Sequence, residues 1–151
     1  MTPVPFLQII ALVFAGLALI PAGAHFFELP GKMALGRDEY FIVQQIYAGW
    51  SLFGIALFGS LAANLALAVA ARRERMACVF ATAGFASMLT VLLLFFGFVY
   101  PANGATGNWT SVPANWETLR SQWEYGHAVN AVLTFIAFLC VSLSVVVRRE
   151  R

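Results

Sequence analysis

Four long apolar stretches constrain this chain more than any other feature of its sequence. They cover residues 5–27, 41–71, 76–100 and 124–147, and each reaches or exceeds the roughly 20 residues that a helix needs to cross the hydrocarbon core of a membrane. Inside a bilayer the backbone must satisfy its own hydrogen bonds, so such stretches predict helices. We therefore expect an all-α fold, an integral membrane four-helix bundle that forms one transmembrane domain over residues 1–151.

The composition supports a lipid environment and excludes a nucleic-acid partner. Only 11% of the residues are charged, whereas soluble domains carry about a quarter. The net charge is +2, and no stripe of Lys and Arg with interleaved aromatic residues is present. The expected partners are the lipid bilayer and a small apolar or aromatic molecule. Small residues in the second stretch suit close helix packing, within the monomer or across a homo-oligomer; they are Gly49, Gly54, Gly59, Ala62 and Ala63.

The basic residues predict the orientation of the bundle. Six of the nine fall in two regions that four spans place on the same side, namely Arg72, Arg73, Arg75, Arg148, Arg149 and Arg151. Because positive charge favours the cytoplasmic side, we expect both termini there, in a multi-pass protein of a bacterial inner membrane. Residues 28–40 and 101–123 then form outer connections. The second of these is long, and Asn115 is suited to cap a short helix within it.

The first apolar stretch is expected to be a retained helix and not a cleaved signal peptide. Residues 22–24 (Ala-Gly-Ala) resemble a cleavage site, but no Lys or Arg precedes Lys32. The basic segment that begins a signal peptide is therefore missing.

The two histidines of the chain occur in mirrored contexts. The first stretch ends with His25 and Glu28, and the fourth begins with Glu124 and His127. Residues three apart lie on one face of a helix. Because the end of the first helix and the start of the fourth share the outer side, both His/Glu pairs are expected at a similar depth. Ionisable residues inside a membrane are costly, so we take this group as the candidate site.

Several chemistries are compatible with these four residues. Glu-x-x-His on bundle helices is typical of carboxylate-bridged metal sites, although the two further Glu of such sites are missing here. His25, Glu28, Glu124 and His127 are thus candidate ligands for an Fe, Zn, Cu or Mn ion. They are equally candidates for acid/base catalysis or for a structural network that joins the first helix to the fourth. Haem with His25 and His127 as axial ligands is a lesser alternative, since carboxylates do not suit its pocket.

Arg120 extends the candidate site. It precedes Glu124 by four residues, so on a continuous helix it is able to pair with that carboxylate or to bind an anionic group of a substrate. Its alternative role is that of an arginine anchored at the membrane interface. The catalytic candidates are therefore His127, Glu124 and Arg120.

The segment 115–128 resembles the signature that opens the last helix of the anthrone oxygenase-like proteins, a family of small four-helix membrane proteins. The positions that carry the resemblance are Trp116, Leu119, Arg120, Trp123, Glu124 and His127. Chain length and the four-helix layout are also similar. The resemblance implies an oxygenase or oxidoreductase that acts on a flat polyketide-like aromatic. The best-described relatives oxidise anthrones to anthraquinones and are regarded as needing no metal.

Two classes of function therefore stand side by side. The first is a membrane oxidoreductase with a His/Glu site between the first and fourth helices near the outer face. The second is a non-enzymatic protein, either a binding or transport module for a small molecule or a structural subunit of a membrane complex.

Overall fold

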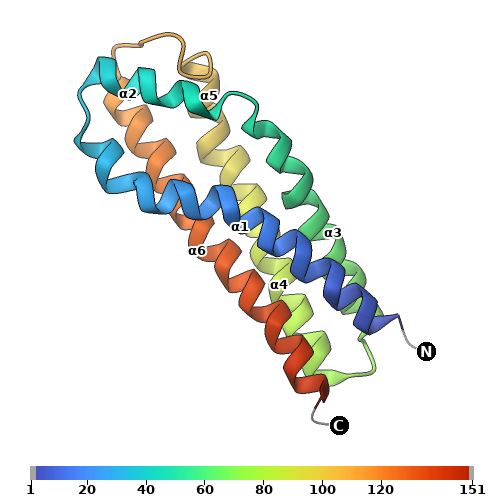
Figure 1. Cartoon of the computed structure of the whole chain (residues 1–151). Coiled ribbons are helices and arrows are strands. Elements are labelled where there is room, and N and C mark those ends of the chain that lie inside the picture. Colours follow the sequence, from blue (N-terminus) through green and yellow to red (C-terminus); the bar gives the residue numbers. More distant parts are fainter. Residues whose placement is uncertain (1–2, 150–151) are drawn as a thin grey trace.

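The computed structural model describes residues 3–149, and in this range the chain is all-α (Figure 1). Its α-helices are α1 (Val4–Ala34), α2 (Arg37–Gln44), α3 (Gly54–Ala70), α4 (Arg75–Leu94), α5 (Tyr100–Ala105) and α6 (Trp116–Arg149). Four stretches are long and apolar enough to cross a membrane: Val4–Ala34, Trp50–Ala70, Arg75–Ala105 and Trp116–Val147. The predicted all-α four-helix bundle is confirmed, and these four stretches support a multi-pass membrane protein.

The four long helices pack in a closed ring. α1 contacts α3 and α6, and α4 contacts the same two helices from the other side. Large apolar side chains cover the outside of the bundle, as lipid contact requires. They include Phe6, Phe27, Ile55, Val69, Leu93, Phe96, Val132 and Leu143. Arg151, which contributes to the predicted orientation, lies outside the described residues.

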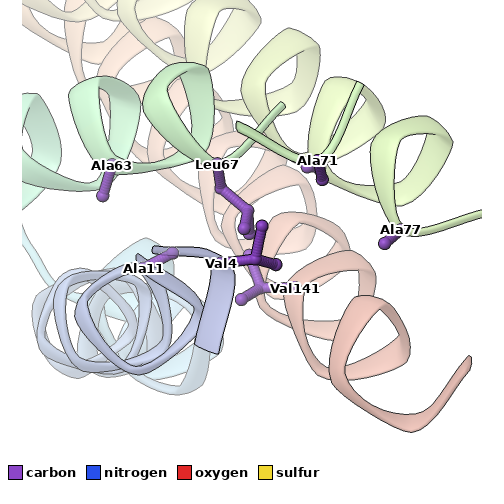
Figure 2. Packing of buried hydrophobic residues seen from close by; sticks show 8 residues of the cluster. Val4, Ala11, Ala63, Leu67, Ala71, Ala77 and Val141 are labelled. Atoms are coloured by element: carbon purple, nitrogen blue, oxygen red, sulfur yellow. The ribbon is translucent and has the colours of Figure 1, made fainter. Parts of the chain in front are cut away.

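Both ends of the described chain lie at the same end of the bundle (Figure 1). There Val4 of α1 packs against Leu67 of α3 and Val141 of α6 in a buried cluster rich in alanine (Figure 2). Beside this cluster the Gln8 amide Nε2 donates to the carbonyl oxygen of Ser144 at 2.8 Å. Small side chains let helix backbones approach closely in a membrane. We call this the terminal end, and the opposite end, where α2 and α5 lie, the distal end.

The predicted first helix ends too early. α1 continues past Phe27 to Ala34, although Pro30 lies within this extension. The apolar pattern stops at Phe27, but the next turns of the helix still bury side chains: Lys32 is only 4% exposed. Glu28 and Lys32 thus belong to a helix at the distal end and not to a loop.

The predicted second helix is wrong as a single element. Residues 41–71 form the end of α2, two 3₁₀ turns (η1, Gln45–Tyr47, and η2, Trp50–Phe53) and α3. Gly49 between the two turns has φ = 85°, in the left-handed region that favours glycine. This break lets α2 cross the distal end of the bundle (Figure 1).

The other two predicted helices are too short. After α4 the chain passes through a π-helical turn (η3, Phe95–Val99) into α5, so the helical run reaches Ala105. α6 begins at Trp116, directly after Asn115 as predicted, and continues without a break into the fourth span. The predicted short helix within 101–123 is therefore the first part of α6.

Close packing of α1 on α3 leads to a first prediction. A Cβ atom added at Gly59 of α3 would lie 2.4 Å from the nearest ring carbon of Phe14 of α1. Gly59→Ala should therefore lower the free energy of unfolding by about 1–3 kcal/mol, the usual cost of overpacking. Thermal unfolding in detergent checks this. Gly16→Ala is the matched control, because nothing lies within 4 Å of its added Cβ, and Phe14→Leu should restore stability to the Gly59 variant.

Candidate functional site

Two imidazoles meet between α1 and α6 in the distal half of the bundle. The ring centroids of His25 and His127 are 4.0 Å apart, with 30° between the ring planes. Within residues 3–149 neither imidazole has a hydrogen-bond partner, and Nδ1 of His25 is a buried, unpaired nitrogen. The ring nitrogens of both imidazoles are therefore available to hydrogen-bond a bound molecule.

Aromatic rings surround the two imidazoles. The ring centroid of Trp123 lies 4.2 Å from that of His127 and 4.9 Å from that of His25. The two 3₁₀ turns contribute Tyr47 and Trp50, whose ring centroids lie 4.7 and 5.4 Å from that of His25. The break at Gly49 is therefore what places these two aromatic residues against the histidine pair.

The carboxylates of the predicted site bind a lysine. Lys32 Nζ lies 3.0 Å from Oε2 of Glu124 and 3.6 Å from Oε2 of Glu28. It also donates to the hydroxyl oxygen of Tyr47 at 2.9 Å, and that hydroxyl in turn donates to Glu28. Lys32 and Glu124 are buried, at 4% and 0% exposure, whereas Glu28 is 39% exposed. The ion pair is thus internal, with one half-exposed carboxylate at its edge.

α2 completes the environment of Glu124. The Tyr40 hydroxyl donates to Oε1 of Glu124 at 2.8 Å, and Nε2 of Gln44 donates to the same oxygen at 3.4 Å. Burial, together with the neighbouring Glu124 charge, raises the pKa of the Tyr40 phenol above its usual range. Burial and the hydrogen bond to Glu28 raise the pKa of Tyr47 in the same way. Both phenols therefore remain protonated donors at neutral pH.

Arg120 does not make the predicted ion pair with Glu124 in the described part of the chain. Its guanidinium donates to the carbonyl oxygen of Leu35 at 2.9 Å and lies 4.8 Å from the ring centroid of Trp116 and 5.5 Å from that of Tyr40. These contacts turn the guanidinium toward the end of α1. The cation paired with Glu124 is Lys32.

An aromatic cluster closes the distal end above the ion pair. The indole nitrogens of Trp109 and Trp123 both donate to Oδ1 of Asn103, at 3.1 and 2.8 Å. Tyr40 and Phe41 of α2 pack on Trp109, and their ring centroids lie 5.2 and 5.6 Å, respectively, from that of Trp109. The loop after α5 thus folds back over the site and holds the start of α6 in place.

The donor set does not fit a metal ion. Over residues 3–149 no three His, Cys, Asp or Glu side chains are grouped so that they share one ion. The ammonium of Lys32 lies where a cation would bridge Glu28 and Glu124. Haem does not fit either, since bis-histidine ligation places the macrocycle between the two imidazoles, and rings stacked at 4.0 Å leave no space for it.

The fold and site define a multi-pass, all-α membrane protein with an internal ion pair beside an imidazole pair. Comparison of the chain with protein-family models, curated proteins and solved structures found no match. The sequence pattern missed Lys32, Tyr40 and Tyr47 as parts of the site. The signal for Lys32 was its position four residues after Glu28, which becomes informative once α1 is extended.

The buried ion pair leads to a second prediction. Lys32→Met leaves Glu124 as an uncompensated buried charge, which should lower the free energy of unfolding by about 3–5 kcal/mol. The double substitution Lys32→Met with Glu124→Gln should recover much of this loss. Denaturation in detergent measures all three variants. Arg37→Met is the control, because Arg37 pairs with Asp38 in solvent; equal effects at residues 32 and 37 would contradict a buried pair.

Proposed function

We propose that this protein is a membrane oxidoreductase whose His25–His127 pair acts in acid/base catalysis on a small, flat aromatic substrate. The observation that carries the proposal is the imidazole pair itself, which is enclosed by aromatic rings and has no protein hydrogen bonds in the described chain. A buried polar nitrogen without a partner costs about 1–3 kcal/mol, so it is expected where a ligand supplies the partner. The resemblance of residues 115–128 to anthrone oxygenase-like proteins supports the same substrate class.

The proposed reaction needs a base and dioxygen. An imidazole removes a proton from the CH₂ group of an anthrone, and the resulting carbanion is electron-rich enough to react with O₂. The overall change converts the CH₂ group into a carbonyl and releases one water, so anthrone and O₂ give anthraquinone and H₂O. General acid/base catalysis contributes roughly 10²- to 10⁴-fold in rate.

The ion pair supports this role by fixing the two helices. Lys32 and Glu28 lie on α1 with His25, and Glu124 lies on α6 with His127, so the contacts of Lys32 set the relative position of the imidazoles. The carboxylates are already bound to the ammonium and to the two tyrosine hydroxyls. We therefore assign the base to a histidine and not to Glu28 or Glu124. We also propose that the distal end faces the outer side of a bacterial inner membrane.

A structural, non-enzymatic role is the second candidate. Its support is that Lys32, Glu28 and Glu124 satisfy one another, as a network that clamps α1, α2 and α6 would require. On this candidate the histidines are packing residues, and purified protein oxidises no anthrone above the rate in protein-free membranes.

Replacement of the base gives the third prediction. His127→Ala should lower kcat for anthrone oxidation by about 10²- to 10⁴-fold, and His127→Phe should do the same while keeping an aromatic ring in place. Anthraquinone absorbance and O₂ uptake of protein in nanodiscs measure this. Tyr125→Phe is the control, since Tyr125 is 56% exposed on the same helix. Wild-type turnover in both His127 variants would rule out catalysis by this imidazole.

The same preparations separate acid/base from metal catalysis. We expect turnover to survive treatment with a chelator. Elemental analysis that finds one Fe, Zn, Cu or Mn ion per chain, lost together with activity, would contradict the acid/base assignment.

A further inference from the structure

Positive charge is concentrated at the terminal end of the bundle (Figure 1). Residues 72–75 and 148–149 lie at this end and contain five arginines and one glutamate, which gives a formal charge of +4. Residues 28–39 and 117–124 lie at the distal end and contain three basic and five acidic residues, which gives a formal charge of −2. The terminal end is therefore the end that attracts an anionic partner.

The turn between α3 and α4 carries three of these arginines on a fixed backbone. The N–H of Ala71 donates to the carbonyl oxygen of Leu67 at 2.8 Å, and the N–H of Glu74 donates to the carbonyl oxygen of Ala71 at 2.7 Å. Ala71 and Leu67 are fully buried in the alanine-rich cluster of the terminal end (Figure 2). The turn is thus anchored to the core, and we call residues 71–75 the arginine turn. Its exposed basic residues are Arg72, Arg73 and Arg75.

The guanidinium groups of the arginine turn have no protein partners in the described part of the chain. Within residues 3–149 none of the three makes an ion pair or a hydrogen bond. The basic residues of the distal end differ in this respect: Lys32 and Arg37 make ion pairs, and Arg120 donates to a backbone carbonyl oxygen. The arginine turn therefore offers positive charge that its own chain does not neutralise.

Lipid-exposed apolar side chains adjoin the arginine turn on both helices. Leu65 and Val69 lie four residues apart on one face of α3, in its last turns, and are 47% and 55% exposed. Met76 and Val79 lie three residues apart on one face of α4, in its first turns, and are 46% and 53% exposed. Positive charge at the end of an apolar surface matches a phospholipid, whose anionic headgroup lies above its acyl chains.

We propose that the arginine turn binds the headgroup of an anionic phospholipid, with the acyl chains against α3 and α4. The residue type supports a phosphate ligand, because the planar guanidinium donates two parallel hydrogen bonds to phosphate oxygens. The excess of positive charge disfavours a zwitterionic headgroup, which carries a cation of its own. The proposal concerns the terminal end and goes beyond the proposed function, on which it does not depend.

Lipid binding to the detergent-solubilised full chain tests the proposal. Native mass spectrometry gives apparent dissociation constants for palmitoyl-oleoyl-phosphatidylglycerol and for phosphatidylcholine with the same acyl chains. Wild-type protein should bind phosphatidylglycerol about 10- to 100-fold more tightly, since each basic residue near anionic lipid is worth about fivefold. The triple substitution Arg72→Gln, Arg73→Gln and Arg75→Gln should remove most of this preference and leave the affinity for phosphatidylcholine within about twofold of wild type.

A matched pair of single substitutions separates the site from the overall charge of the protein. Arg73→Gln should weaken binding of phosphatidylglycerol by about fivefold. Arg37→Gln removes the same charge from an exposed arginine of the distal end and should leave binding unchanged. Each variant should unfold in lipid-free detergent at the wild-type temperature, because exposed arginines contribute little to stability. If the triple variant does not fold, Arg73→Gln carries the test.

Each outcome supports the proposal or overturns it. Equal affinity of the wild type for both lipids would overturn it, as would equal losses in Arg37→Gln and Arg73→Gln. Inorganic phosphate alone should not raise the unfolding temperature, whereas phosphatidylglycerol should. A rise with phosphate as large as that with the lipid would assign the arginine turn to a free anion and overturn the lipid site. Selective binding of phosphatidylglycerol by a protein that oxidises no anthrone would support this site and remove only the proposed oxidation.

Discussion

The distal half of the bundle depends on the ion pair between Lys32 and Glu124. Both groups are buried, and an unpaired charge at that depth would cost several kcal/mol. The pair is stable only with its neighbours: Tyr40 and Gln44 donate to the carboxylate, and Tyr47 accepts from the ammonium. Because these groups come from α1, α2, the 3₁₀ turn η1 and α6, one charge pair holds four elements in a fixed relation. Because the ion pair joins α1 to α6, it also holds His25 of α1 against His127 of α6.

The two halves of the molecule are stabilised by different interactions. The terminal half packs alanines, Leu67, Val4 and Val141 at close helix distance, and its helices are regular. The distal half contains the ion pair, the aromatic cluster and the two 3₁₀ turns η1 and η2. The π-helical turn lies there too, and Gln122 of α6 donates to the Phe98 carbonyl within it at 2.7 Å. π-Helical turns are frequent at functional sites, because they change the direction of side chains relative to a regular α-helix.

The sequence was sufficient to predict the elements that depend on hydrophobicity. It was not sufficient to predict the elements whose ends are determined by buried polar contacts. The four spans follow from apolar length alone. The end of α1 cannot be predicted in this way, because Lys32 looks like an ordinary loop lysine in the sequence. Its role depends on the ion pair with Glu124, which lies 92 residues later in the chain. The break of the second stretch was equally hidden: Gly49 resembles the other small residues of that helix, and only its φ of 85° distinguishes it. Arg120 and Glu124 do lie four residues apart on one continuous helix, as expected. The Arg120 guanidinium nevertheless contacts the carbonyl oxygen of Leu35 and two aromatic rings, and not the Glu124 carboxylate.

The mirrored order of the two motifs has a simple physical reading once the helix directions are known. α1 runs toward the distal end, so His25 comes before Glu28 and Lys32; α6 runs away from it, so Glu124 comes before His127. Each helix therefore places its carboxylate about one turn nearer the distal surface than its imidazole. The result is a layer of charged groups toward the distal surface and a pair of imidazoles beneath it. Glu-x-x-His here separates the carboxylate from the imidazole: the carboxylates bind Lys32, and the imidazoles are left without protein partners. This layering underlies our proposal that the two imidazoles transfer protons, in place of the metal centre that the Glu-x-x-His motif suggested.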